Sequence, residues 1–441
     1  MNENIKNLLL DIRFYLLLFF VLRLYGITDA PLESSHSWRQ CITNTIARNF
    51  SEMGLDLMHP RVDLGGEKTG ILGSEFPLLN ALIYLGHSIF GFQHWYGRLI
   101  NLLVSTTGLY FFYQLIRNLY TKKLAFHSTL LLTLSVWFMF SRKIMPDTFS
   151  VSLVIIGLYF AYAYLKKGNW KNLLLYFLFC TLGILCKIPA LSIFSVIVSV
   201  LFIKNINFKR KWNLLILGAI SILIISAWYF LWVPHLVSTY HYQLYISKGL
   251  LEGIQEIKPL FGRFLKRFYF DAFHSFVAFA CFLGGIIFLL KNKQSILLKC
   301  LGIITTIFIL FICKTGNVFP LHSYYIIPFV PVMALVAGYF LTQIPIKIQY
   351  VLLAIIAIES IANQHHDLRI KERNRVLTEL EDKVDQFIPK DDLIITSGGR
   401  APQNMYFAHR KGWVAFDHNV MRKKFTDSLA NIGAKYLLIK K

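Results

Sequence analysis

Charged residues are scarce in this sequence, and acidic residues are fewer than basic ones. Only 16% of the 441 residues are charged, with 24 Asp and Glu against 46 Lys and Arg, whereas 55% are hydrophobic. This composition excludes an ordinary soluble domain. Several apolar runs, for example residues 213–232, reach the length of about 20 residues that spans a hydrocarbon core. The sequence therefore predicts a polytopic α-helical membrane protein.

Cysteine is also rare, and its placement indicates no disulfide framework. Five of the six Cys lie in or at the ends of apolar runs, and only Cys41 lies in a loop. A small-residue cleavage site is lacking after the first apolar run, residues 8–25. We therefore expect this run to be a retained helix and not a cleaved signal peptide.

Eleven apolar segments have the character of membrane spans. They lie near residues 8–26, 97–116, 124–140, 148–165, 172–186, 188–203, 213–233, 272–290, 296–313, 324–342 and 348–362. Another apolar segment, residues 76–92, is shorter and is interrupted by Gly86, His87 and Gly91. It either crosses the membrane or lies in the interface.

The distribution of Lys and Arg decides between these two interpretations. If residues 76–92 do not cross, the basic connections 117–123, 166–171, 204–212 and 291–299 all lie on the side of the N-terminus. Connections rich in Lys and Arg are typically cytoplasmic. We therefore predict a cytoplasmic N-terminus and an interfacial helix at residues 76–92. The net charge of +22 then reflects orientation in the membrane and not binding to nucleic acid.

The chain divides into two predicted domains. Residues 1–363 form a transmembrane domain whose first outer loop, residues 27–96, carries juxtamembrane helices. Residues 364–441 have a soluble composition and predict a small α/β domain on the outer side. Helices are expected there at residues 375–389 and 421–433, and strands near residues 391–399, 412–416 and 434–441. This domain lacks a phosphate-loop signature, so we expect a docking or lid role.

Polar residues gather in the connections that this topology places outside. In the first outer loop, residues 37–54 predict an amphipathic helix that starts at His36 or Ser37. Farther along the chain, Asp147 opens an apolar helix just after Pro146. A carboxylate there is either favoured by the helix dipole or lines a functional cavity, because a charge near the hydrocarbon boundary is costly.

Eleven of these outer polar residues are candidates for a site. The set comprises the carboxylates Glu33, Glu75 and Asp147, the histidines His36 and His322, the cations Arg39, Arg98, Lys143 and Lys187, and the residues Gln40 and Tyr325. Each cation alone is explained equally well by contact with lipid headgroups, and tyrosines by an aromatic belt. Together they suit a reaction in which a carboxylate or His takes a proton from a hydroxyl while cations hold a lipid-borne phosphate leaving group.

The order of these motifs resembles that of GT-C superfamily glycosyltransferases, in the branch of protein O-mannosyltransferases and lipid A aminoarabinose transferases. The resemblance is carried by "IARNF" at residues 46–50, "EFPLLNALIYLGHSIFG" at residues 75–91, Arg98 with Leu99, and Asp147. It implies a sugar donor linked to polyprenyl phosphate and an envelope lipid, glycan or protein as acceptor. It also implies an inverting transfer on the outer face, at a bacterial plasma membrane. Arg98 and Lys187 would bind the donor phosphate, and Asp147 would support the site.

One departure from the family concerns the base. The family's Asp-Glu pair before an Arg falls on His36 and Ser37 if Arg39 is that Arg, so the base is His36, Glu33 or Asp147. The sequence lacks an Asp-rich metal cluster, and we expect no obligatory metal, although Glu33 with Asp147 would suit one divalent cation. Alternative functions are a flippase or a ligase of lipid-linked glycans. Transporters often carry internal repeats, and none is seen in this sequence.

Overall fold

The computed structural model describes residues 10–204, 206–243, 247–399 and 401–439. The chain forms two compact units. Unit 1 comprises Met1–Tyr25, Asn101–Ser226 and Ile246–His365, and unit 2 comprises Gly26–Ile100, Ala227–Tyr245 and His366–Lys441.

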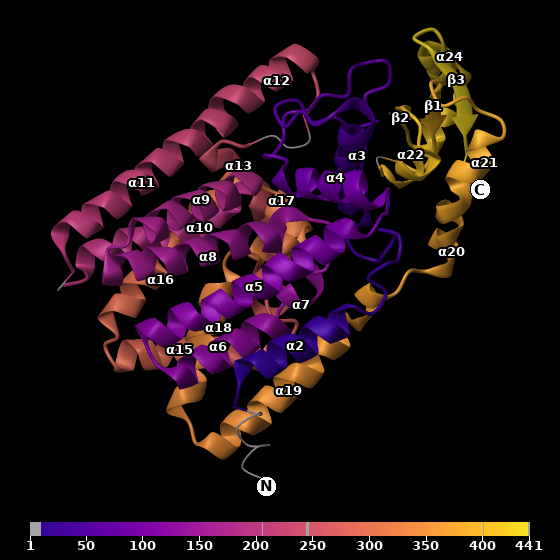
Figure 1. The fold of residues 1–441 in the computed structure, drawn as a ribbon. Helices are drawn as coiled ribbons and strands as arrows, with labels where there is room; N and C mark the ends of the chain where they lie inside the picture. Colours follow the sequence, from indigo (N-terminus) through magenta and orange to yellow (C-terminus); the bar gives the residue numbers. More distant parts are fainter. Residues whose placement is uncertain (1–9, 205, 244–246, 400, 440–441) are drawn as a thin grey trace. The chain divides into compact units, whose positions relative to one another are not determined.

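Unit 1 is helical (Figure 1). Its helices are α2 (Ile12–Arg23), α5 (Tyr96–Leu119, from Asn101 onward), α6 (Lys122–Leu134), α7 (Trp137–Phe140), α8 (Pro146–Lys167), α9 (Trp170–Cys186), η1 (Ile188–Ala190), α10 (Leu191–Phe194), η2 (Ser195–Phe202), α11 (Phe208–Ser226), α13 (Leu250–Ile257), η4 (Lys258–Leu260), α14 (Phe261–Lys266), η5 (Arg267–Asp271), α15 (Phe276–Lys291), α16 (Ser295–Thr315), α17 (Val318–Leu321), η6 (Ser323–Ile326), α18 (Val330–Gln343) and α19 (Ile346–Gln364). A helix occurs in each of the eleven predicted segments.

Five helices of the described chain are long and apolar enough to cross a membrane. They are Tyr96–Leu119, Pro146–Lys167, Phe208–Tyr240, Ser295–Thr315 and Ile346–Leu368. Leu250–Asp271 and Phe276–Lys291, bent by 91°, add a sixth if they form one broken span. The remaining predicted segments hold shorter helices, so the count of eleven crossings stays a prediction.

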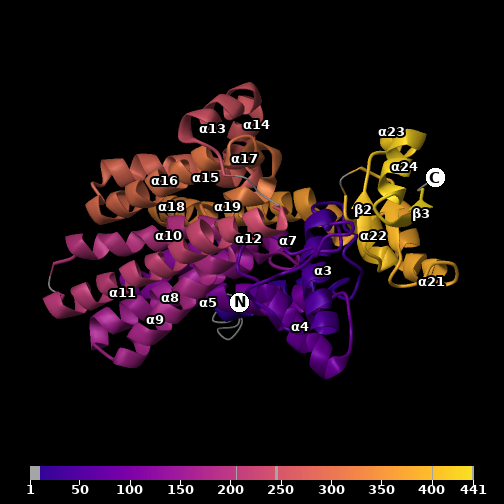
Figure 2. The same cartoon turned by 90° about the horizontal axis from the view of Figure 1, so that it is seen from above.

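Close packing of α8 against α9 sets the geometry at their ends. The two helices are antiparallel neighbours joined at Gly168, which adopts a left-handed conformation (φ +72°), and they lie side by side in Figures 1 and 2. A Cβ atom at Gly157 would come within 2.4 Å of the Cys180 Sγ, and one at Gly183 within 2.8 Å of the Ser150 carbonyl oxygen. Small residues at helix contacts allow this approach. The start of α8 is thereby held beside the end of α9.

Unit 2 combines helices with a small sheet. Its elements are α3 (Ser37–Met53), α4 (Leu78–Phe90), the π-helix η3 (Ala227–Trp232), α12 (Val233–Tyr240), α20 (Glu372–Arg375), η8 (Val376–Glu379), α21 (Leu380–Asp385), β1 (Leu393–Thr396), α22 (Gln403–Ala408), β2 (Gly412–Val414), α23 (Asp417–Val420), α24 (Lys423–Ala430) and β3 (Ala434–Leu438). The strands are parallel in the order β2-β1-β3. This confirms the predicted α/β character of the C-terminal region.

Helix α3 forms the core of unit 2. It starts at Ser37 with His36 as its N-cap, as the sequence predicts. Its apolar face, with Ile42, Ile46 and Phe50, is buried against Val62 and Leu72. The opposite face is covered by the C-terminal region, because Arg48 donates to the carbonyl oxygen of Tyr406 at 2.9 Å. The helix is therefore an interior helix of this unit.

Helix α4 occupies the segment predicted to lie in the interface. It has 13 residues, fewer than the about 20 that a span requires. Ile89 and Phe90 at its C-terminal end are exposed. Helix α6, which lies in a predicted span, has the same length, so the interfacial position of α4 stays a prediction.

Candidate active site

A buried carboxylate and an ammonium group meet at the ends of α8 and α9 in unit 1. Asp147 lies in the first turn of α8, directly after Pro146 at the first helical position, and is 4% exposed. Lys187 follows the last residue of α9. Its Nζ is 4.0 Å from the Asp147 Oδ1. Two residues forty positions apart, predicted separately, thus form one charged pair.

Aromatic side chains surround the Lys187 ammonium group. Its Nζ is 5.8 Å from the ring centroids of both Tyr324 and Tyr325, a distance at which cation–π attraction operates. His322 stacks on Tyr324 with a centroid distance of 5.5 Å. The predicted residues His322 and Tyr325 therefore belong to the same cluster as Asp147 and Lys187. Tyr324 joins them as a further member.

Arg267 fixes the segment that carries these rings. Its guanidinium donates to the carbonyl oxygen of Pro320 at 2.6 and 3.2 Å and also contacts the carboxylate of Asp271. Burial, followed by the positive charges of Arg267 and Lys187, lowers the pKa of His322 below its ordinary value of 6.5. The imidazole is therefore mainly neutral at pH 7. Arg267 was not a predicted site residue, because it lies in a connection already rich in cations.

Asn101 holds the turn that leads into α8. Its side-chain nitrogen donates to the carbonyl oxygens of Phe140, Lys143 and Met145 at 3.0, 2.8 and 3.2 Å. Its Oδ1 accepts hydrogen bonds from Ser105 and Thr148. An Asn inside an apolar segment is a signal that sequence analysis could have used, because polar groups at membrane depth require partners. Asn101 is thus a positioning residue for the turn next to Asp147.

The predicted residue Lys143 lies in this turn. It is buried, and its Nζ is 5.5 Å from the ring centroid of Phe140, whose ring contacts that of Tyr324. All five candidate residues of unit 1, namely Lys143, Asp147, Lys187, His322 and Tyr325, therefore lie in one connected set.

The candidate residues of unit 2 form two ion pairs. Arg98 is fully buried and contacts the carboxylate of Glu33, which is 4% exposed. The same guanidinium donates to the carbonyl oxygens of Asp29 and Ala30, and Gln40 donates to Glu33 at 2.9 Å. Arg98 therefore binds the chain that leads into the first outer loop.

The second pair joins Arg39 and Glu75, whose charged groups are in contact. Arg39 is buried, so it does not lie at the surface of the unit, where a lipid-headgroup contact would place it. His36 is half-buried beside it in sequence and has a left-handed backbone with φ of 60°. This conformation is uncommon for a residue with a side chain, and such conformations cluster at functional sites. His36 is thus the unit 2 candidate with a conformational signal of function.

The expectation of no obligatory metal stays a prediction for the described part of the chain. There, no group of three or more His, Cys, Asp or Glu side chains is arranged to hold a metal ion. Glu33 and Asp147, the pair that the sequence suggested for a cation, lie in different units and each has a cationic partner of its own.

The apolar helices of unit 1 and the charged pairs at their ends define a polytopic membrane protein with a polar site. Residues 74–232 match the family model of dolichyl-phosphate-mannose-protein mannosyltransferases. No curated protein sequence matches the chain.

Solved structures resemble the chain over nearly its whole length. ArnT from Cupriavidus metallidurans bound to undecaprenyl phosphate matches with a TM-score of 0.63 and 12% identity, over 96% of this chain and 89% of that one. The archaeal oligosaccharyltransferase AglB from Archaeoglobus fulgidus, in complex with an inhibitory peptide and a dolichol-phosphate, matches with a TM-score of 0.57 and 12% identity, over 97% and 69%. The resemblance to GT-C membrane glycosyltransferases is thereby confirmed, as a likeness of sequence over residues 74–232 and of fold throughout.

Proposed function

We propose that this protein transfers a sugar from a polyprenyl-phosphate-linked donor to an envelope lipid, glycan or protein. The reaction takes place on the extracytoplasmic face of a bacterial plasma membrane, with the N-terminus in the cytoplasm. The observation that carries the proposal is the Asp147–Lys187 pair. The Lys187 Nζ is 4.0 Å from the Asp147 Oδ1 and 5.8 Å from the ring centroids of Tyr324 and Tyr325. Two of the solved structures similar to this chain were determined with undecaprenyl phosphate and with a dolichol-phosphate, which supports a donor of this class.

The chemistry is a direct displacement at the anomeric carbon. The acceptor oxygen forms a bond to that carbon while the bond from the carbon to the phosphate oxygen breaks. The electron pair leaves with the polyprenyl phosphate, and the hydroxyl proton goes to a base. Cations placed where negative charge develops stabilise such a transition state. We assign this role to Lys187 and Lys143, and the single displacement gives inversion.

Two residues are candidates for the base. Asp147 is buried and is held next to Lys187, whose Nζ is 4.0 Å from the Asp147 Oδ1. His36 carries an imidazole, a side chain that commonly acts as a general base, and it has an uncommon backbone conformation. Glu33 is the weaker candidate, because Arg98 and Gln40 already contact its carboxylate. We therefore assign Glu33, Arg98 and Gln40 to positioning of the first outer loop, together with the Arg39–Glu75 pair.

The proposal is tested with the purified chain in lipid vesicles. The vesicles should consume a polyprenyl-phosphate sugar and release polyprenyl phosphate only when an acceptor is present. Since we propose no obligatory metal, turnover should persist in EDTA. Movement of intact donor between leaflets without release of polyprenyl phosphate would contradict the proposal and establish a flippase.

A further inference from the structure

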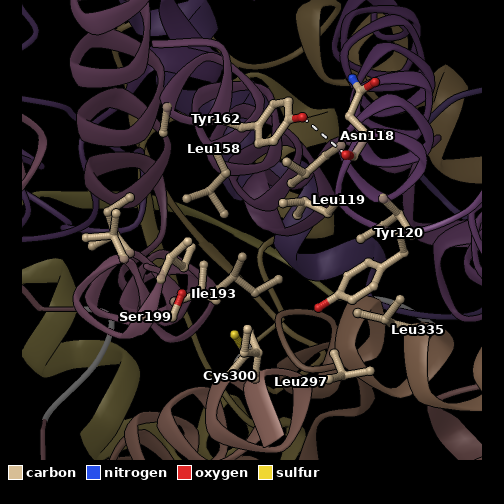
Figure 3. A pocket seen from close by; sticks show the side chains of 18 of the residues that line it. Asn118, Leu119, Tyr120, Leu158, Tyr162, Ile193, Ser199, Leu297, Cys300 and Leu335 are labelled. Carbon is tan, nitrogen blue, oxygen red and sulfur yellow. Dashed lines mark hydrogen bonds between the residues drawn. The ribbon is translucent and has the colours of Figure 1, made fainter. Parts of the chain in front are cut away.

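Unit 1 contains a cavity that is lined by none of the residues of the candidate active site. Its volume is about 420 Å³, and it is lined by α5, α8, α10, η2, α16 and α18. Figure 3 shows Leu119, Leu158, Ile193 and Leu297 around it, from four different helices. Protein interiors have few voids larger than a water molecule, so a space of this size between packed helices calls for an occupant.

The cavity is remote from Asp147 along helix α8. Asp147 lies in the first turn of this helix, whereas Leu158, Tyr162 and Lys166 line the cavity from its second half. At 1.5 Å per residue, Lys166 is about 28 Å from Asp147 along the helix axis. The cavity is therefore not the site of the proposed transfer reaction.

The cavity walls are hydrocarbon, and the polar groups lie toward one end of the helices. Most lining side chains are Leu, Ile and Val. The hydroxyl of Tyr162 is already bound to the carbonyl oxygen of Asn118 at 3.1 Å (Figure 3). Lys166 and Lys204, both exposed, are the cations among the described lining residues, which include no carboxylate. A fitting occupant has long apolar chains and an anionic head.

The connections next to the cavity are also positively charged. The four connections next to its lining residues, 117–123, 166–171, 204–212 and 291–299, contain Lys and Arg but no Asp or Glu. Arg210 also caps the end of α8 by donating to the carbonyl oxygens of Leu165 and Lys166 at 3.1 and 2.9 Å. Clusters of Lys and Arg that adjoin membrane helices bind anionic lipid headgroups.

We propose that this cavity is a binding site for an anionic phospholipid of the adjacent leaflet. The acyl chains fill the space between α5, α8, η2 and α16, and the phosphate is held by Lys166 and Lys204. The site is independent of the transfer reaction at Asp147. Occupancy of this site therefore depends on the headgroup charge of the surrounding lipids.

The test is native mass spectrometry of the delipidated, purified full chain. The chain is titrated with phosphatidylglycerol, and with phosphatidylcholine of the same acyl chains. We expect one retained phosphatidylglycerol per chain. The double variant Lys166→Gln/Lys204→Gln should weaken this binding about tenfold, since two near-surface cations are lost. The matched control Lys258→Gln/Lys347→Gln removes two exposed cations that neither line the cavity nor lie in the four basic connections, and it should bind as the unchanged chain does.

Occupation of the cavity itself is tested by filling it. Ser199→Trp places a large ring in the space without changing charge, and it should abolish the retained lipid. A thermal unfolding curve shows whether the Ser199→Trp variant is folded. If it is misfolded, the lysine variants still test the proposal, because they change exposed side chains. Equal retention of phosphatidylcholine, or equal weakening by the control pair, would overturn the proposal. Displacement of bound phosphatidylglycerol by equimolar undecaprenyl phosphate would also overturn it, and would assign the cavity to a polyprenyl lipid.

Discussion

Arg98 and Glu33, sixty-five positions apart in the sequence, form an ion pair that is buried on both sides. Loss of one partner from a buried pair typically costs about 3–5 kcal/mol, because the other charge is left unpaired. Glu33→Gln and Arg98→Met should each lower the thermal unfolding temperature strongly. The double variant should recover much of the loss. If Glu33→Gln unfolds like the unchanged chain yet has no turnover, Glu33 is the base and its positioning role is wrong.

Asp147 is expected to act in the reaction and not merely to start a helix. Asp147→Asn should lower turnover by about 10²-fold or more, the usual contribution of a proton-transferring group. Asp11 offers a control, since it lies at the start of another helix of unit 1, as the N-cap of α2, and contacts Arg13. Asp11→Asn should leave turnover unchanged. Equal, small effects of the two substitutions would show that Asp147 only stabilises its helix, and His36→Ala would then be the variant expected to abolish turnover.

Asn101 should control the geometry of the turn before α8. Asn101→Ala removes the donor to three carbonyl oxygens at once. A buried polar group left without a partner costs about 1–3 kcal/mol, so we expect a lower free energy of unfolding. We also expect a lower kcat, while the unfolding transition stays nearly as cooperative as in the unchanged chain. Ser105→Ala removes just one hydrogen bond to the same side chain and should have a smaller effect on both. A loss of stability with normal kcat in the folded fraction would argue against the positioning role.

The distance between Asp147 and Lys187 depends on the contact of α8 with α9. A Cβ atom at Gly183 would come within 2.8 Å of the carbonyl oxygen of Ser150, so Gly183→Ala should separate the helices and lower turnover. Gly302 in α16 is the control, because a Cβ atom there would meet no atom of the described residues within 4 Å. Gly302→Ala should be neutral. Steady-state kinetics of the two variants in the same vesicles make the comparison, and full activity of Gly183→Ala would refute it.

A histidine in unit 2 should make the docking of the C-terminal region depend on pH. The His409 ring contacts Glu381 at 2.5 Å and Glu52 at 2.6 Å. Burial alone would lower the pKa of His409, but these two carboxylates outweigh it and raise that pKa above its ordinary 6.5. The hydrogen bond from His409 likewise holds the pKa of Glu381 at about 2.

The raised pKa of His409 and the lowered pKa of Glu381 affect stability at opposite ends of the pH range. A raised histidine pKa gives stability that is complete below pH 6.5 and is lost as pH rises through the folded-state pKa. The lowered carboxyl pKa gives stability that is lost as pH falls from about 4.5 toward 2. The protection factors of the α22 backbone amides in hydrogen exchange should therefore be largest between these limits. His409→Gln should remove the high-pH dependence, and an unchanged profile in that variant would exclude the histidine as its source.

The amino-acid sequence determines much of this protein by itself. The length and polarity of its apolar runs set the membrane class and the order of the helices, because hydrocarbon excludes unpaired polar groups whatever the packing. The start of α3 at Ser37 and the three C-terminal strands followed from local periodicity. The five candidate residues of unit 1 were found as costly polar groups in apolar surroundings. Local patterns sufficed for all of these.

Tertiary structure alone decided which charges neutralise one another. Lys187 and Arg98 are similar in sequence, each a single cation near an apolar run, yet Lys187 faces Asp147 and two tyrosine rings while Arg98 is buried against Glu33. The difference arises from contacts between residues forty or more positions apart, which periodicity does not encode. The role of Asn101 is hidden for the same reason, because its three carbonyl partners come together only when α5 packs against the turn before α8.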